Sequence, residues 1–283
     1  MIQKLSADFE HNLFQYFFKH RSSVPYYYKS TSFAEWKNSL LFDQDFSNGP
    51  QFKDLETYIW LENNEIQCFI QFGLSAFIFG ENGRNFEKHY GIIRNFHFAQ
   101  DTTREAAQEL LNLAAAYFDK NGIRKTYAYF HYFGMSCFAR QGKLHESEFY
   151  IEDLLHENAY RVEHENIYYS KLLIEATQDV DIHLEYSKNG NLLHFKRDNS
   201  TLGQAELTYT PAADLAYLRW IGMKPEFQGQ GIGTDCMRAL CADLFNKGYK
   251  RLDTDTAENN YSAQKYYEKN GFADLGRMRS YQK

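Results

Sequence analysis

The chain has 283 residues with 43% hydrophobic and 24% charged side chains, which fits a globular protein of one large or two ordinary domains. Its net charge of -6 and pI near 5.9 argue against a general nucleic-acid-binding protein. Since it lacks a signal-peptide pattern and any apolar run near ~18 residues, we expect a cytoplasmic protein without membrane attachment.

The first half is predicted to contain helices, then strands, then alternating helices and strands. Residues 1–45 are read as helical, and the Ser-x-x-Glu pattern at 32–35 is a capping box that opens a second helix. The apolar face of the first helix comprises Leu5, Phe9, Leu13, Tyr16 and Phe17. The elements expected next are strands at 57–61, 67–72 and 90–98, a helix at 103–120, a strand at 125–132, a helix at 151–157 and a strand at 167–173. Many α+β folds begin in this order.

The second half goes directly into strands, within 182–209 and at 216–223, and then into a glycine-rich turn. Residues 228–234 read Gln-Gly-Gln-Gly-Ile-Gly-Thr. A helix follows them and ends at Lys247-Gly248. Its apolar residues recur at helical spacing and are Met237, Leu240, Cys241, Leu244 and Phe245.

This context gives the three alternate glycines a physical role. Without Cβ atoms, the backbone can adopt positive φ and lie close to a ligand. Successive N–H groups at the start of a helix then favour an anion, and a pyrophosphate is the natural guest. A flexible loop without a ligand is the alternative. No Gly-Lys-Ser/Thr follows, so the stretch is not a Walker A loop, and the dinucleotide Gly-x-Gly-x-x-Gly spacing is also absent.

Two motifs carry a family resemblance. The Gln-x-x-Gly-x-Gly run after a strand and a Pro-Glu-Phe turn resembles the acyl-CoA pyrophosphate loop of the GNAT N-acetyltransferase superfamily. Downstream, the segment 260–272 is similar to that family's Asn-x-x-Ala-x-x-x-Tyr-x-x-x-Gly-Phe segment at every signature position. The match covers roughly residues 190 to 283 and implies the GNAT fold there.

A weaker repeat of this pattern lies in the first half. With an offset of 112, Asn158-Ala159-Tyr160 falls on Asn270-Gly271-Phe272, and with an offset of 126, Asn121-Gly122 falls on Lys247-Gly248. The chain is therefore interpreted as an α+β protein of two GNAT-like domains, each a mixed antiparallel sheet flanked by helices. We expect a degenerate structural and acceptor-pocket domain at 1–172 and an acetyl-CoA-binding catalytic domain at 173–283.

The repeat predicts which domain performs the chemistry. Gly229, Gly231 and Gly233 correspond to Thr103, Glu105 and Ala107, so the first half has no glycine there and would place a carboxylate near a pyrophosphate. Under the other offset, Asn260 corresponds to Glu148 and Tyr267 to Leu155. We therefore expect the first domain to have lost its phosphate loop.

The resemblance implies a role for each site residue. A splayed strand at Ile221, Gly222 and Met223 would bond the pantetheine arm and polarise the acetyl carbonyl. Asn260 would bond the pantetheine side, and Tyr267 would protonate the leaving thiolate as general acid. The pyrophosphate would lie against Gln228, Gly229, Gln230, Gly231, Ile232, Gly233 and Thr234.

Several points stay open at the level of sequence. Tyr266 competes with Tyr267 for the acid role, and either could be a packed aromatic. The general base could be Glu206, Asp214, the carboxyl-terminal region or a water chain. His97 and His131 could line a cleft, although ordinary hydrogen-bonded histidines are the simpler interpretation. Neither the histidines nor the four cysteines have metal-ligand spacing, so no metal is expected.

The resemblance leaves two classes of function open. The first is an acetyltransferase that moves the acetyl group of acetyl-CoA directly to a primary amine of a small molecule or peptide. The second is a non-catalytic acyl-CoA-binding or sensing protein on the same scaffold. A glycine loop together with an intact Tyr267 favours the enzyme, because a sensor needs no proton donor for a thiolate. Neither the acceptor nor the oligomeric state is encoded in a motif.

Overall fold

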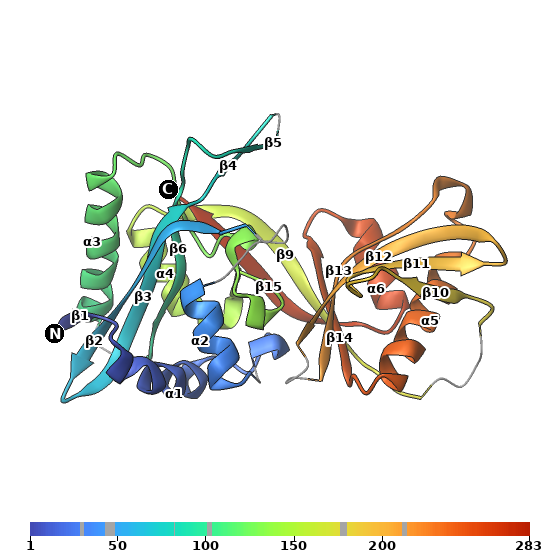
Figure 1. The fold of residues 1–283 in the computed structure, drawn as a ribbon, viewed down its shortest axis with the longest axis horizontal. Helices are drawn as coiled ribbons and strands as arrows, with labels where there is room; N and C mark the ends of the chain where they lie inside the picture. The colour runs from blue at the N-terminus through green and yellow to red at the C-terminus, as the bar shows by residue number, and fades with distance from the viewer. Residues whose placement is uncertain (29–30, 43–48, 82, 101–103, 176–179, 211–213) are drawn as a thin grey trace. The chain divides into compact units, whose positions relative to one another are not determined.

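The computed structural model describes residues 1–28, 31–42, 49–81, 83–100, 104–175, 180–210 and 214–283 (Figure 1). The chain divides into two compact units. Unit 1 contains Met1–Val24, Thr31–Glu165 and Met278–Lys283, and unit 2 contains Pro25–Ser30 and Asn166–Arg277. Both units combine helices with a mostly antiparallel sheet, so the predicted α+β class is confirmed.

The two units differ from the expected domains at 1–172 and 173–283 in three segments. Residues 25–30 and 166–172 belong to unit 2, whereas residues 278–283 belong to unit 1. Two long strands pass from one unit to the other. β9 (Arg161–Leu172) crosses after Glu165, and β15 (Ala273–Gln282) crosses back after Arg277.

Unit 1 is built on a sheet in the order β1-β2-β3-β6-β7-β15, in which only β6 and β7 run parallel. Its strands are β1 (Ile2–Lys4), β2 (Phe52–Glu62), β3 (Glu65–Ser75), β6 (Gly91–Phe98), β7 (Thr126–Ala128) and β8 (Leu144–His145), with a separate hairpin of β4 (Ile78–Gly80) and β5 (Gly83–Asn85). Its helices are α1 (Glu10–His20), α2 (Phe33–Phe42), α3 (Arg104–Lys120) and α4 (Phe149–Glu157). Helices α3 and α4 bury their apolar faces in one core with β3, β6 and β7.

The beginning of the chain departs from the helical interpretation of residues 1–45. β1 pairs antiparallel with β2, with Ile2 opposite Trp60, and helix α1 begins only at Glu10. Leu5 therefore lies before the helix, because a strand partner almost 60 residues away overrides local spacing. The capping box is confirmed, since the Ser32 N–H donates to Glu35 Oε2 at 3.0 Å and the Glu35 N–H donates to Ser32 Oγ at 3.2 Å. Residues 43–48 and the expected helix start at Thr103 lie outside the described residues.

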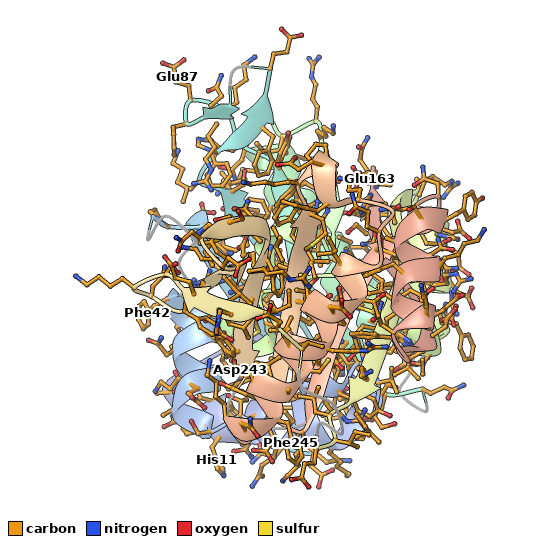
Figure 2. All side chains as sticks on the ribbon, turned by 90° about the vertical axis from the view of Figure 1, so that its right-hand side faces the viewer. His11, Phe42, Glu87, Glu163, Asp243 and Phe245 are labelled. Carbon is orange, nitrogen blue, oxygen red and sulfur yellow. The ribbon has the colours of Figure 1, made fainter. Side chains whose placement is uncertain are left out.

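Unit 2 has the sheet order β9-β14-β13-β12-β11-β10, in which only β13 and β14 run parallel. Its own strands are β10 (His183–Tyr186), β11 (Leu192–Arg197), β12 (Ser200–Thr210), β13 (Leu215–Met223) and β14 (Arg251–Ala257), and its helices are α5 (Ile232–Asn246) and α6 (Tyr261–Lys269). Both helices pack on one face of this sheet in a single core. The far end of α5 is held by Asp243, labelled in Figure 2, which pairs with Lys247 at 2.8 Å and accepts a hydrogen bond from Tyr186.

A shared irregularity shows that the two units are copies of one fold. The β3–β6 register shifts so that Arg94 is an extra residue, and the β12–β13 register shifts in the same way at Arg219. In each unit, the bulged strand pairs in parallel with the strand that follows the next helix. The predicted tandem organisation is therefore present in the structure.

The copies also exchange their last strands. The segment α3-β7-α4-β9 of the chain corresponds to α5-β14-α6-β15. After α4, residues 166–172 of β9 pair antiparallel with β14 in unit 2. After α6, the end of β15 pairs with β7 and β8 in unit 1. The sheet of unit 2 is thus completed by β9, which follows α4 of unit 1, and the sheet of unit 1 by β15, which follows α6 of unit 2.

Candidate active site

The first element of the site is the open end of β13. This strand pairs with β12 along its whole length, from Leu215 to Met223. Its parallel pairing with β14 covers only Leu215–Leu218 opposite Arg251–Thr254 within the described residues. The bulge at Arg219 marks the point where the two strands separate. Beyond the bulge, Ile221 and Gly222 have no strand partner on the β14 side within the described residues, so an extended ligand can pair with the backbone there.

The second element is the glycine turn between β13 and α5. Gly229 and Gly231 have φ values of 74° and 81°, which L side chains rarely adopt. A Cβ atom added to either glycine would meet nothing within 4 Å, so both face open space. The turn is fixed from outside by Gln228, which donates to the Met223 carbonyl at 2.9 Å, and by Gln230, which donates to the Glu226 carbonyl at 2.7 Å. Gly231 is the N-cap of α5, so the unpaired first amides of that helix favour an anion here.

These elements line one cavity of about 580 Å³ in unit 2. Ten of the twelve predicted site residues line it: Ile221, Gly222, Met223, Gln228, Gly229, Gly231, Gly233, Thr234, Asn260 and Tyr267. The other two do not, because the Gln230 side chain is tied to the Glu226 carbonyl and Ile232 packs against the core. Five further residues line it, of which the sequence analysis considered only Tyr266 for a role, as the alternative acid: Phe227, Ser262, Ala263, Tyr266 and Lys269. Four of these share a face of α6 with Asn260 and Tyr267, so helical spacing from the motif could have indicated them.

The two tyrosines of α6 have different surroundings. The Tyr266 hydroxyl donates to the Gly233 carbonyl at 2.7 Å and so ties α6 to the first turn of α5. Tyr267 is 5% exposed, and burial raises the pKa of its hydroxyl while a hydrogen bond with the Thr254 side chain lowers it in part. Tyr267 is therefore protonated at neutral pH and lines the cavity as a potential proton donor. Asn260 caps α6, since its side-chain oxygen accepts from the Ala263 N–H at 3.2 Å.

The candidate bases Asp214 and Glu206 and the two candidate cleft histidines do not line this cavity. Asp214 pairs with Lys250 at 2.5 Å. Because Asp214 directly precedes β13, it lies at the opposite end of that strand from Ile221, roughly 20 Å along it. Glu206 is on β12, is partly exposed and lies 3.5 Å from Arg219 of β13. His97 and His131 belong to unit 1, where burial lowers the pKa of His97 well below its usual value. Asp214 is therefore excluded as the base by its position.

The face of the unit 2 sheet opposite Tyr267 carries a buried acid that the sequence analysis did not predict to have a role. Asp253 on β14 is 0% exposed and accepts a hydrogen bond from the Tyr168 hydroxyl. Burial raises the pKa of Asp253 to about 6, against the lowering effect of Ser170, Tyr168 and Arg251. Between about pH 4 and 6, Asp253 is therefore protonated to a greater extent in the folded protein than in the unfolded chain.

This acid gives a prediction for stability. Because its folded-state pKa is raised, the contribution of Asp253 becomes less favourable as pH rises through this window. The Asp253→Asn variant lacks this titration. We expect its free energy of unfolding, relative to wild type, to increase by on the order of 2 kcal/mol from pH 4 to pH 7. Urea unfolding at several pH values measures this difference, and a difference that is constant with pH would contradict it.

The corresponding region of unit 1 contains different chemistry. Glu148 is the N-cap of α4, as Asn260 is of α6, and it pairs with Arg21 at 2.9 Å with both side chains 3% exposed. Leu155, which matches Tyr267, is buried in the core. Glu105 lies on the exposed first turn of α3. The described part of unit 1 therefore has an ion pair and a leucine where unit 2 has its cap and its tyrosine.

Residues 148–272 match the family model of the acetyltransferase (GNAT) family. The resemblance to this family predicted from the two motifs is therefore confirmed. A sequence comparison with curated proteins gave no significant match.

Solved structures share the tandem fold. The glucosamine N-acetyltransferase region of a fungal multi-domain β-N-acetylglucosaminidase has a TM-score of 0.68 at 9% identity, with 100% of this chain and 38% of that chain covered. A tandem GNAT protein from the clavulanic acid biosynthesis pathway has a TM-score of 0.65 at 10% identity, with coverage of 100% and 98%. An N-acetyltransferase from Sphaerobacter thermophilus has a TM-score of 0.64 at 8% identity, with coverage of 100% and 95%. At these identities the likeness concerns the fold alone.

Two further observations concern the described residues only. None of their helices is both long and apolar enough to span a bilayer. No group of three or more His, Cys, Asp and Glu side chains among them is arranged to hold a metal ion.

Proposed function

We propose that unit 2 is an N-acetyltransferase that moves the acetyl group of acetyl-CoA directly to a primary amine of a small molecule or peptide. The observation that supports this most is the single cavity lined by the open end of β13, the glycine turn and Tyr267. These are the three parts that acyl transfer from a pyrophosphate-bearing thioester needs: an extended edge, an anion site and a proton donor.

The residues present fit acetyl-CoA. Gly229 and Gly231 leave space where side chains would otherwise stand, and the first turn of α5 supplies N–H groups to a diphosphate. The pantetheine arm would extend along Ile221–Met223, whose β14-facing backbone groups lie beyond the paired part of the strand. Lys269 adds a cationic side chain to the cavity lining. Acetyl-CoA supplies the activated acetyl group when it is bound.

The protein's own residues would then act on the two negative charges that the reaction forms, one on the carbonyl oxygen and one on the leaving sulfur. A backbone N–H of β13 beyond the bulge would stabilise negative charge on the carbonyl oxygen. The Tyr267 hydroxyl, whose pKa is raised by burial, would hold its proton until the thiolate leaves and then donate it to sulfur. Tyr266 has a different part, because its hydroxyl already donates to the Gly233 carbonyl.

We further propose that the domains have different roles, with acetyl-CoA bound by the C-terminal GNAT domain and not by the N-terminal one. The Arg21–Glu148 ion pair and Leu155 support this, since neither offers an anion site or a proton donor like those of unit 2. A cytoplasmic location is part of the same proposal, because the cytoplasm supplies acetyl-CoA.

The second candidate is an acyl-CoA-binding or sensing protein without catalysis. The observation that keeps it open is that Tyr267 packs in the core with Tyr169 and Phe272 and could be structural. A thiol-release assay with acetyl-CoA and a panel of amines separates the two functions. Turnover on one amine supports the enzyme, whereas acetyl-CoA binding without turnover on any amine supports the sensor.

Removing the proposed acid gives a further prediction. In Tyr267→Phe we expect kcat to fall by about 10- to 100-fold, because the leaving thiolate loses its positioned donor. The Kd for acetyl-CoA should change by less than about threefold, since the aromatic ring and its packing remain. Steady-state kinetics and calorimetric titration measure the two quantities.

Tyr266→Phe is the matched control for this experiment. It removes the hydrogen bond to the Gly233 carbonyl that ties α6 to the first turn of α5. We therefore expect acetyl-CoA affinity to weaken by about 1 kcal/mol, while kcat stays near wild type. Equal losses of kcat and acetyl-CoA affinity in Tyr267→Phe would show that Tyr267 is structural.

A further inference from the structure

A second cavity, of about 420 Å³, lies in unit 1 at the position that corresponds to the cavity of unit 2. Glu148 and Tyr150 line it at the start of α4, and the offset of 112 places them on Asn260 and Ser262, which line the other cavity at the start of α6. Ala99 lines it directly after β6, the strand that corresponds to β13. The place between the end of the bulged strand and the second helix is therefore hollow in both copies.

The side chains that line this cavity differ from those of unit 2. Seven of the eight carry a polar group, and only Ala99 has none. The carboxylate of Glu148 would repel a diphosphate, and the cavity is smaller than the one of about 580 Å³ in unit 2. Most ligand pockets are lined mainly by apolar side chains, so a lining this polar favours a small, water-soluble ligand over acetyl-CoA.

The ion pair between Arg21 and Glu148 forms part of this lining. Arg21 Nη1 lies 2.9 Å from Glu148 Oε2, and both side chains are 3% exposed. Burial raises the pKa of Glu148, and Arg21 and the Ser22 N–H lower it. Protonation of Glu148 would remove the counter-ion of a buried guanidinium group, which is always charged. The pair therefore presents one positive and one negative charge to the cavity.

The second carboxylate oxygen of Glu148 is available to a ligand. Oε1 is buried and has no hydrogen-bond partner among the described residues. His97 Nε2 is 3.7 Å from it, too far for a hydrogen bond, and is 3.3 Å from the Tyr150 hydroxyl. Glu148 is the N-cap of α4, yet its side chain makes no capping bond, whereas that of Asn260 does. Since a buried ion pair is stable only when its remaining lone pairs are satisfied, a donor from a ligand at Oε1 would stabilise this one.

The two opposite charges select the charge of the ligand. A simple cation at Glu148 Oε1 would be repelled by Arg21, and a simple anion would be repelled by Glu148. The ammonium and carboxylate groups of an α-amino acid are joined through one carbon atom, so their polar atoms are about 3 Å apart. This separation is close to the 2.9 Å between Arg21 and Glu148, so each group of the amino acid can lie against the charge of opposite sign.

We propose that the cavity of unit 1 binds a free α-amino acid, with its ammonium group hydrogen-bonded to Glu148 Oε1 and its carboxylate on the side of Arg21. Gln100 and Ser147 line the cavity and are exposed, so they form its rim. Their amide and hydroxyl groups favour an amino acid with a polar side chain. This site lies entirely within unit 1 and does not depend on the proposed acetyltransferase function of unit 2.

Calorimetric titration of the full chain with serine, threonine, asparagine and glutamine tests the site. The matched probes for serine are ethanolamine, which lacks the carboxylate, and 3-hydroxypropionate, which lacks the ammonium group. We expect saturable binding of at least one amino acid, and loss of either charged group should weaken binding at least about tenfold. Absence of saturable binding for all four amino acids, or equal affinity for either analogue of serine, would overturn the proposal.

Two variants of the lining locate the bound amino acid. Glu148→Gln keeps the shape of the side chain but removes its charge, so amino-acid affinity should fall at least about tenfold. Because this change also breaks a buried ion pair, Gln100→Trp is the second variant: its indole fills the cavity from an exposed position and leaves the pair intact. It should also weaken binding at least about tenfold. Gln15→Trp, on an exposed position of α1 outside the lining, is the matched control and should bind as wild type does.

Acetyl-CoA titration of the same variants distinguishes this site from the one in unit 2. Gln100→Trp should keep wild-type affinity for acetyl-CoA, which also shows that the variant is folded, and Gly231→Glu should keep wild-type affinity for the amino acid. Amino-acid binding that both Glu148→Gln and Gln100→Trp leave unchanged would place the ligand elsewhere and reject the proposal. Binding that Gln100→Trp abolishes supports the site even if the wild type acetylates no amine, in which case only the proposed acetyltransferase function fails.

Discussion

Gly231→Glu is expected to abolish acetyl-CoA binding while the protein stays folded. Gly231 has a φ of 81° and caps α5, and the space beyond its missing side chain belongs to the cavity. A glutamate there would place bulk and a negative charge at the helix start where a diphosphate is expected. Repulsion of about 1 to 4 kcal/mol together with the lost space should raise the Kd at least about 100-fold. Calorimetric titration with acetyl-CoA measures this change.

Gly190→Glu provides the matched control for this experiment. Gly190 also belongs to unit 2, has a φ of 76° and faces open space, but it lies in the turn between β10 and β11 and does not line the cavity. Both variants carry the backbone strain of a side chain at positive φ, about 1 to 2 kcal/mol, so their melting temperatures should fall alike. Only Gly231→Glu should lose the cofactor. Retention of wild-type affinity in Gly231→Glu would overturn the pyrophosphate assignment.

The parts of the site that are local in sequence could be predicted. The glycine turn depends on φ values and on the helix that follows it, and the α6 residues depend on helical spacing from Asn260 to Tyr267. Both are encoded within about a dozen residues. The resulting cavity accordingly contains ten of the twelve predicted residues.

The parts that depend on strand pairing could not be predicted. The buried Asp253 accepts a hydrogen bond from Tyr168, which is 85 residues away in the sequence. The alternation of β14 indicates two faces but does not indicate which strands lie beside it. β1 lies within the residues predicted as helical, because the partner that makes it a strand, β2, begins 50 residues later.

Strand exchange also limits what the repeat could show. Offsets of 112 and 126 align the two halves as copies, and the bulges at Arg94 and Arg219 correspond at an offset of 125, one residue from the second. An alignment of copies cannot reveal that the strand after α4 and the strand after α6 each join the other copy's sheet. The family match to residues 148–272 begins before β9, which is consistent with this strand serving the C-terminal copy.

The exchange makes a strong prediction for fragments of the chain. A fragment of residues 173–283 lacks all of β9, whose residues 166–172 pair with β14 along its whole length. It also loses Ile167 and Tyr169 from the core, each worth about 1.5 to 3 kcal/mol of burial, and the Tyr168 hydroxyl that bonds Asp253. Since a domain of this size is stable by only about 5 to 15 kcal/mol, we expect no cooperative unfolding transition and no acetyl-CoA binding.

The fragment of residues 160–283 is the matched comparison, because it restores β9 with only 13 more residues. It still lacks Tyr26–Tyr28, whose Tyr27 ring packs on Tyr168 and Tyr217, so its stability should remain below that of unit 2 in the full chain. We expect a cooperative thermal transition and measurable acetyl-CoA affinity for 160–283 but neither property for 173–283. Full-chain affinity in 173–283 would show that the C-terminal copy is complete without the borrowed strand, and the boundary at residue 172 would then describe an autonomous catalytic domain.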